Sequence, residues 1–294
     1  MQREPVIVEL RDVTVDFAGL RALAGVSCTI AGQGVCGLIG TNGAGKTTLI
    51  HAAVGLREVN SGEVVVQGDP EAVAYCPDTP NFDPYLTAAE VLQESARLGA
   101  PARRRRLEPE TLLDEVGLAE AGHRRVGGFS RGMLQRLGIA AALSRDPAVL
   151  ILDEPTSALD PLGREAVLSL IAQLGTRMMV VFSSHVLEDV DRVATHLLVL
   201  NRGNLVYAGE RAGFGGTAPS DTLTLELAHG IAALTEELDR AGLSWQQGSG
   251  PRQVVVGAAA LPLLLERIGR EPGSLVELAR RDSLLTEFIK RIAA

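Results

Sequence analysis

The chain has 294 residues, of which 46% are hydrophobic and 22% are charged, and its net charge is −8. This length suffices for one large domain, or for a medium domain and a small one. The acidic balance gives no reason to expect a nucleic-acid partner, and three cysteines without a CxxC pair argue against a disulfide framework or a zinc site. No stretch reaches the roughly 18 apolar residues that span a bilayer, so we expect a soluble, cytoplasmic chain that reaches a membrane only through a partner.

Short β-rich runs open the chain: VIVEL (6–10), VTVDF (13–17) and VSCTI (26–30). Turn residues between them predict separate antiparallel strands. VCGLIG (35–40) is an apolar strand that ends in glycine, and a helix is expected to begin near Lys46. An apolar strand, a glycine loop and a helix together form the context of a phosphate-binding loop.

Residues 84–146 are predicted to be mostly helical, because apolar positions recur at helical spacing in 88–98 and 111–118. AVLILD (148–153) and RMMVVFSS (177–184) read as buried strands that a helix connects. Strand, helix and strand in this order predict a parallel sheet with right-handed crossovers. LLVLNRGNLVYAG (197–209) predicts a hairpin that turns at Arg202, Gly203 and Asn204.

A Gly, Ser and Pro-rich stretch at 213–220 predicts a linker, after which the α/β pattern restarts. Strands are expected at 222–227 and 253–257, and helices at 231–242 and 261–269. The sequence therefore predicts a first domain over 1–212, with its helical part at about 84–146, and a small α/β domain over 221–294. The small domain carries no chemical motif, which favours an interaction or dimer-bracing role.

GTNGAGKTT (40–48) fits the phosphate-loop pattern fully. Its glycines let backbone N–H groups turn inward around the β-phosphate. Lys46 adds positive charge between the β- and γ-phosphates, and the Thr47 hydroxyl is suited to bind Mg²⁺. The predicted nucleotide contacts are Gly40, Thr41, Asn42, Gly43, Ala44, Gly45, Lys46, Thr47 and Thr48.

Two carboxylates, Asp153 and Glu154, close the apolar strand at 148–152. Asp153 suits the coordination shell of Mg²⁺, through a bound water, and Glu154 suits the base that positions a water on the γ-phosphate. The alternative is that the two acids only end the strand in solvent and have no role in a site. The phosphate loop in the same chain argues against this alternative.

Three further stretches carry a family resemblance: LDEPTSALDP (152–161), GGFSRGMLQRL (127–137) and SSHVLEDVDR (183–192). Together with the phosphate loop, they resemble the ATP-binding cassette (ABC) family over about residues 6–210. The resemblance implies a P-loop NTPase core with a mixed sheet flanked by helices, an antiparallel β subdomain and a helical subdomain. It also implies that two cassettes sandwich two ATP molecules head to tail.

Residues 129–133 (FSRGM) stand where the family has its signature motif, and they are called the signature segment below. In such a dimer, Ser130 and Gly132 of this segment would act on the nucleotide of the partner cassette, with Ser130 as the N-cap of the following helix. By the same resemblance, Asp160 belongs to a loop that communicates across the dimer and His185 contacts the γ-phosphate. Phe17 occupies the place of the aromatic residue that stacks on adenine. Taken alone, a histidine after a strand is more often a packed core residue, and only the position of His185 after VVFSS favours the functional role; Phe17 taken alone could equally be a core residue.

The sequence departs from the family at Asp78 and at Arg131. Asp78 stands where the family presents a glutamine to Mg²⁺ and the attacking water, and it is shorter and charged. Arg131 replaces the first signature glycine but keeps the backbone N–H. Both features resemble exporter cassettes whose permease is a separate polypeptide, and the C-terminal domain resembles their small α/β appendage, which ends in a helix at 282–293.

These observations predict an ATPase subunit that powers a membrane exporter through ATP-driven dimerisation. Its expected partners are an integral membrane permease, which holds it at the inner face of the cell membrane, and a second cassette of the same or another kind. The region around 80–100 would pass motion to the permease. One alternative is a soluble ABC-type ATPase with a non-membrane partner, and another is a small-molecule kinase, which would have no use for the motifs at 129–133 and 157–160.

Overall fold

The computed structural model describes residues 6–17, 19–99, 107–157, 159–214, 222–248, 250–270 and 275–280. The chain divides between Phe214 and Gly215 into two compact units, each described by itself below. Among the described residues, no helix has the length and apolar character to cross a membrane.

An antiparallel sheet opens the first unit, with the order β2 (Leu20–Ala31), β1 (Ile7–Phe17) and β4 (Ser61–Gln67). The prediction of two separate strands over 6–17 was wrong, because β1 runs through both. Asp12 adopts a left-handed φ of 52°, and the pairing with β2 shifts register between Leu10 and Val13. A bulge thus continues the strand where the sequence resembles a turn.

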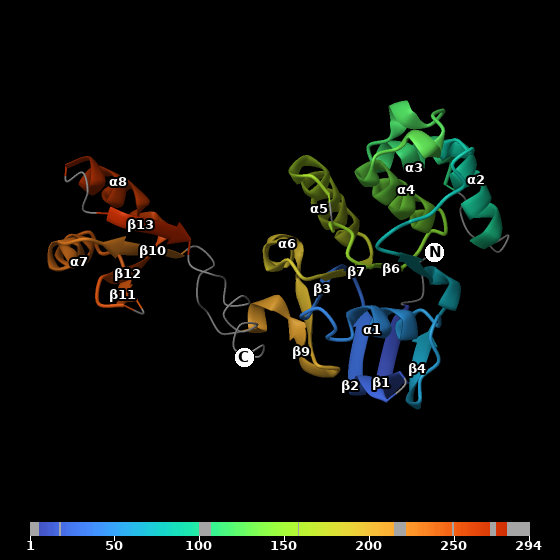
Figure 1. The fold of residues 1–294 in the computed structure, drawn as a ribbon, viewed down its shortest axis with the longest axis horizontal. Helices are drawn as coiled ribbons and strands as arrows, with labels where there is room; N and C mark the ends of the chain where they lie inside the picture. The colour runs from blue at the N-terminus through green and yellow to red at the C-terminus, as the bar shows by residue number, and fades with distance from the viewer. Residues whose placement is uncertain are drawn as a thin grey trace. The chain divides into compact units, whose positions relative to one another are not determined.

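The central sheet of this unit has six strands in the order β5-β6-β7-β3-β8-β9, parallel except for the hairpin of β8 with β9. Every residue of β6 and β7 is buried, as expected for parallel strands covered on both faces. Figure 1 shows this sheet with α5 and α6 above it and the antiparallel sheet below. The strands are β3 (Gly34–Ile39), β5 (Val73–Cys76), β6 (Val149–Leu152), β7 (Met179–Ser184), β8 (His196–Asn201) and β9 (Asn204–Glu210).

Helix α1 (Lys46–Ala53) begins where the sequence predicts, and its buried Leu49 and Ile50 belong to one core with residues of both sheets. The helices in the described part of 84–146 form a separate group in Figure 1, and they confirm the mostly helical prediction for this part. They are α2 (Ala88–Gly99), α3 (Pro109–Glu115) and α4 (Arg131–Leu143). The remaining helices of the unit are α5 (Pro161–Gly175) and α6 (Leu187–Val193).

Helix α4 packs closely on the segment that follows β5. At Gly138, a Cβ atom would lie 2.5 Å from Pro80 Cγ and 2.9 Å from Cys76 Sγ, so only glycine allows this approach. Arg136, two residues earlier, donates to the carbonyl oxygens of Val116 and Gly117 at the end of α3. The same helix therefore joins the helical group to the end of β5.

The three cysteines are buried and unpaired. Burial raises the pKa of Cys28 to about 11 and the pKa values of Cys36 and Cys76 to about 12. These thiols therefore behave as small apolar side chains.

The first unit extends two residues beyond its predicted end. Phe214 is buried, and its ring packs edge-to-face on Tyr207 with centroids 4.7 Å apart. Residues 215–220 of the predicted linker lie outside the described residues.

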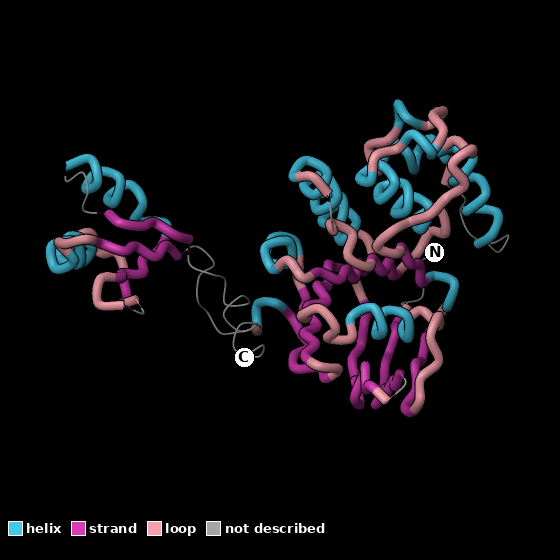
Figure 2. Tube along the Cα trace, viewed as in Figure 1, coloured by secondary structure: helices cyan, strands magenta, loops and turns pink. Residues whose placement is uncertain are grey.

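The second unit has the element order β-α-β-β-α-β and an antiparallel sheet in the order β11-β12-β10-β13, which is a ferredoxin-like arrangement. Leu225, Leu234, Val254, Val256 and Leu264 form its core. Figure 2 shows the strands of this unit in magenta and its helices in cyan. The elements are β10 (Thr222–Leu227), α7 (Ile231–Arg240), β11 (Trp245–Gln247), β12 (Gln253–Gly257), α8 (Leu261–Arg270) and β13 (Leu275–Arg280); the helix expected at 282–293 lies outside the described residues.

Candidate nucleotide-binding site

The carboxyl ends of four parallel strands meet at one edge of the six-stranded sheet. The register pairs Cys76 with Leu152, Leu152 with Phe182, and Ile39 with Ser184. Ligand sites of parallel sheets lie at this edge. The edge carries most of the predicted site: Asp78, Asp153, Glu154, His185 and the phosphate loop that follows β3.

The phosphate loop depends on its glycines for close packing. A Cβ atom on Gly40 would lie 2.7 Å from the carbonyl oxygen of Leu200, and one on Gly45 would lie 2.5 Å from that of Ala22. Gly43 and Gly45 have φ values of 79° and 106°, in the left-handed region. Thr41 and Thr47 are exposed, so the loop presents its polar groups and the N-terminus of α1 to solvent, where an anion is favoured.

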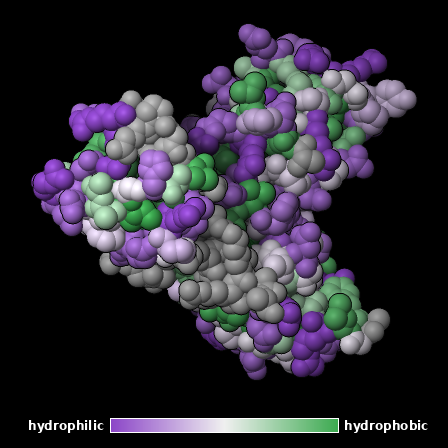
Figure 3. All heavy atoms as spheres, turned by 60° about the vertical axis from the view of Figure 1, so that its left-hand side comes forward, coloured by the Kyte–Doolittle hydropathy of each residue, from purple (hydrophilic) through white to green (hydrophobic). Residues whose placement is uncertain are grey.

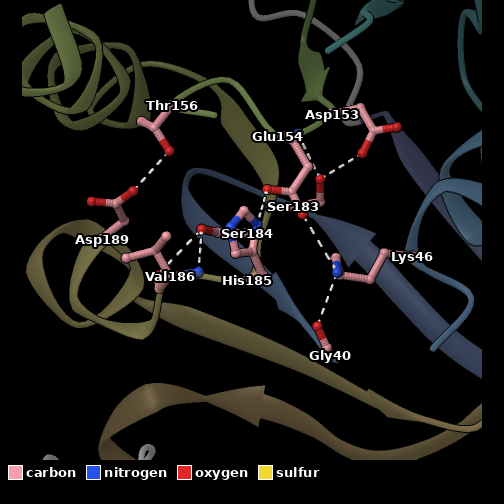
Figure 4. A network of polar contacts seen from close by, with 10 residues as sticks. All are labelled: Gly40, Lys46, Asp153, Glu154, Thr156, Ser183, Ser184, His185, Val186 and Asp189. Atoms are coloured by element: carbon pink, nitrogen blue, oxygen red, sulfur yellow. Dashed lines mark hydrogen bonds and ion pairs between the residues drawn. The ribbon is translucent and has the colours of Figure 1, made fainter. Parts of the chain in front are cut away.

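Lys46 extends from the start of α1 toward the end of β6, although only 7% of its surface is exposed. Its Nζ donates to the carbonyl oxygen of Gly40 over 2.9 Å and lies 3.4 Å from Glu154 Oε1. The ammonium group therefore joins the phosphate loop to the carboxylate that follows β6 (Figure 4).

Glu154 is contacted on its other oxygen by His185, whose Nδ1 lies 2.8 Å from Glu154 Oε2. The carboxylate is thus held between the Lys46 ammonium and an imidazole, with part of its surface open to solvent. A carboxylate in this setting can accept a proton from water, and a neighbouring cation can stabilise negative charge that develops beside it.

Asp153 is almost fully buried at the end of β6. Its N–H donates to the carbonyl oxygen of Cys76, and its Oδ1 accepts a 2.6 Å hydrogen bond from Ser183 Oγ. Ser183 Oγ also accepts the N–H of Glu154 over 2.7 Å. The sequence reasoning missed Ser183, and the only signal for it was its place two residues before His185.

Asp78 is exposed and lies two residues beyond β5. Burial raises the pKa of the neighbouring Tyr75 to about 12, and the charges of Asp153 and then Asp78 add to this effect. The register pairs Cys76 of β5 with Leu152 of β6, which puts Asp78 on the same edge of the sheet as Asp153. The Tyr75 hydroxyl also makes a 3.2 Å hydrogen bond with Nε2 of His51 on α1.

A second buried carboxylate, Asp189 on α6, was also missed by the sequence reasoning. Its Oδ2 accepts a 2.7 Å hydrogen bond from Thr156 Oγ1, and its Oδ1 accepts a 2.6 Å bond from Arg164 Nε. Asp189 thereby joins α6, which follows His185, to the segment after Glu154 and to α5. Nothing in the residue pattern indicated these partners.

Ser130 and Asp160 cap two helices. Ser130 Oγ accepts the N–H of Met133 at the start of α4, which confirms the predicted N-cap, and Asp160 Oδ1 accepts the N–H of Gly163 at the start of α5. A Cβ atom on Gly132 would lie 3.8 Å from Leu159 Cδ2, so the signature segment and the Asp160 loop are neighbours within the chain.

Phe17 ends β1 and packs partly against the core. The guanidinium carbon of Arg57 lies 4.3 Å from the centroid of its ring, a cation–π contact that the sequence did not suggest. A cavity of about 370 Å³ adjoins this pair, lined by Val15, Asp16 and residues 56–60.

Within the described part of the chain, no group of three or more His, Cys, Asp or Glu side chains could hold a metal ion. Mg²⁺ commonly takes one or two protein ligands and completes its shell with water and phosphate oxygens. The hydroxyl of Thr47 and the carboxylate of Asp153 are oxygen donors of the required kind.

The family model described as "ABC transporter" matches residues 23–157. The chain is 39% identical over 205 residues to the ABC transporter ATP-binding protein YxlF of Bacillus subtilis (strain 168), covering 68% of this chain and 70% of that protein. It is 31% identical over 215 residues to the Nod factor export ATP-binding protein I of Rhizobium sp. (strain N33), covering 69% and 71%.

A solved structure of an ATP-binding subunit of an ABC transporter superposes with a TM-score of 0.62 and 28% identity, over 70% of this chain and 90% of the other. The chain therefore belongs to the family of ABC transporter ATP-binding proteins, whose enzymatic activity is that of an ATPase.

Proposed function

We propose that this chain is the ATP-hydrolysing subunit of a membrane exporter, and that two such cassettes dimerise around ATP. The observation that carries the hydrolytic role is the Glu154 carboxylate, which lies between Lys46 and His185 beside the phosphate loop. In this proposal Glu154 positions and deprotonates the attacking water, and Lys46 and His185 stabilise charge on the γ-phosphate.

Mg²⁺ would be held by Thr47 and, through water, by Asp153, with Asp78 nearby at the end of β5. When bound, the ion neutralises phosphate charge and polarises the γ-phosphate. The exposed Thr47 hydroxyl and the fixed Asp153 carboxylate fit this ion, because Mg²⁺ prefers oxygen donors. The loop residues 40–48 would bind the phosphates, and Phe17 would stack on adenine.

The N-termini of α4 and α5 support the dimer part of the proposal. Ser130, Gly132 and Asp160 lie at exposed or half-exposed positions, where a second cassette could meet them. In this arrangement Ser130 and Gly132 close the nucleotide site of the partner, because a helix N-terminus favours phosphate charge.

Export and a permease partner are supported by the relatives and by the surface of the helical group. One relative is a Nod factor export protein by name. Tyr85 and Leu98, at either end of the α2 region, are 77% and 89% exposed, and a permease would cover such side chains. In the coloured part of Figure 3, apolar side chains lie among hydrophilic ones. Through its permease, the chain would lie on the cytoplasmic face of the membrane.

The hydrolytic role is tested by the substitution Glu154→Gln, which keeps the size of the side chain but cannot accept a proton. We expect ATP binding to remain and turnover to fall by about 100-fold or more. Glu120→Gln, at an exposed position away from the site, is the matched control and should hydrolyse ATP like the wild type. Near-normal turnover by Glu154→Gln would remove Glu154 from the catalytic role.

The exporter assignment is tested separately by purification from membranes. We expect an integral membrane protein to co-purify with the tagged chain in stoichiometric amount, and its transport to require ATP. If the chain instead co-purifies with a soluble complex, the alternative of a soluble ABC-type ATPase is correct.

A further inference from the structure

The hydroxyl of Ser183 connects the two acids of the site. Ser183 is fully buried at the end of β7, where its Oγ donates to Asp153 Oδ1 over 2.6 Å and accepts the Glu154 N–H over 2.7 Å (Figure 4). A hydroxyl has one proton to donate and two lone pairs to accept with, so both bonds can exist together. One oxygen atom thus contacts the side chain of the first acid and the backbone of the second.

Glu154 adopts an unusual backbone conformation, with a φ of 45°. The left-handed region disfavours residues other than glycine, and such residues persist there where their surroundings fix them. Here the N–H of Glu154 is held by Ser183, and its carbonyl oxygen accepts the N–H of Ser157 over 3.0 Å. The left-handed turn directs the Glu154 side chain toward Lys46 and His185.

The end of β7 therefore holds Glu154 at two points. Ser183 bonds its backbone, and His185, two residues later, bonds its carboxylate. Removing the Ser183 hydroxyl would leave the Glu154 N–H without its acceptor and Asp153 Oδ1 without its donor. A shift of about 1 Å in a catalytic group lowers a rate by up to about 100-fold, so loss of this bond should reach the chemistry.

We propose that Ser183 is a positioning residue for ATP hydrolysis: its hydroxyl fixes both the turn that aims the Glu154 base and the orientation of the Asp153 carboxylate. The proposal rests on the roles proposed above for these two acids. Loss of the hydroxyl should therefore change both the Mg²⁺ requirement and the turnover rate, because the same oxygen contacts Asp153 and Glu154.

The test compares Ser183→Ala, Ser183→Thr and Ser183→Val in the full chain. Threonine and valine have nearly the same shape, so their difference isolates the hydroxyl from the added volume. We expect Ser183→Ala and Ser183→Val to lower kcat by about 10- to 100-fold and to raise the Mg²⁺ concentration that gives half-maximal activity. KM for ATP should change less than about threefold, because the phosphate loop is untouched, and Ser183→Thr should recover most of kcat.

The control is Ser144→Ala, a buried serine whose hydroxyl donates to the Ala141 carbonyl oxygen at the end of α4. It should keep the kcat and the Mg²⁺ requirement of the wild type. Thermal unfolding of every variant separates a folding defect from a catalytic one. If Ser183→Ala does not fold, kcat of the threonine and valine variants is compared at a temperature where both are folded.

Normal kcat and an unchanged Mg²⁺ requirement in Ser183→Ala would overturn the proposal, and so would equal losses in the threonine and valine variants. The Glu154→Gln variant separates this failure from failure of the proposed function. If Glu154→Gln is inactive while Ser183→Ala is normal, only the positioning role is wrong. If Glu154→Gln remains active, the role of Glu154 itself is wrong.

Discussion

The hydroxyl of Thr156 donates a 2.7 Å hydrogen bond to the carboxylate of Asp189, which is only 1% exposed. Thr156 lies two residues after Glu154, and Asp189 lies four residues after His185. The bond therefore joins the same two chain segments that meet at the Glu154 carboxylate, at a second point beside the site.

We expect Asp189→Ala to lower the free energy of unfolding of the first unit by about 2–3 kcal/mol, because Thr156 and Arg164 both lose a charged acceptor. Denaturant unfolding followed by circular dichroism measures this loss. Asp191→Ala on the same helix is the control: its ion pair with Arg211 is partly exposed, and we expect a loss of less than about 1 kcal/mol. Equal losses from the two substitutions would contradict a structural role for the buried bond.

The second prediction concerns adenine recognition by Phe17. Phe17→Ala should weaken ATP binding by about 1–2 kcal/mol, the scale of stacking between a base and an aromatic ring. Phe17→Tyr should be close to neutral, because stacking needs only the face of the ring. Calorimetric titration with ATP and with inorganic triphosphate checks this. Equal weakening for both ligands would remove Phe17 from the base site.

The third prediction tests whether Ser130 acts on the nucleotide of a second subunit. Ser130→Arg places a bulky cation at the N-terminus of α4, and Lys46→Ala removes the ammonium group from the chain's own phosphate loop. Each variant alone should be nearly inactive in a homodimer. In a mixed dimer, one composite site carries both lesions and the other carries neither, so mixing should restore part of the ATPase activity.

Formation of mixed dimers must first be shown by native mass spectrometry. If they form and the activity stays at the level of the single variants, Ser130 does not act across the dimer. If the wild type alone hydrolyses ATP poorly because it pairs with a different cassette, the same experiment applies to that heteromer.

The sequence predicted those features that depend on short, contiguous patterns. Lys46 begins α1 because a glycine loop and an apolar strand precede it, and the hairpin of β8 and β9 turns near Gly203 as expected. The carboxylates at Asp153 and Glu154 were identified because they end an apolar run. Such signals are local, so one stretch of chain contains them completely.

Features that depend on distant partners could not be predicted. The continuity of β1 through Asp12 requires close packing by Gly62, where a Cβ atom would lie 2.3 Å from the Asp12 carbonyl oxygen. The contact of Ser183 with Asp153 joins residues 30 positions apart, and Asp189 meets Thr156 across 33 positions. A serine or an aspartate in a helix or strand has many possible partners, and only the folded chain selects one.

The close contact of Gly138 with Pro80 lies in the second half of α4, so a rotation of the helix about this contact would displace its N-terminus most. Eight residues separate Gly138 from Ser130, which corresponds to about 12 Å along a helix. A tilt of about 5° about that contact would move the Ser130 end by about 1 Å, more than the full range of ordinary hydrogen-bond lengths. A tilt of α4 beside Pro80, two residues from Asp78, would therefore displace Ser130 by more than a polar contact between this end of the helix and a bound group tolerates.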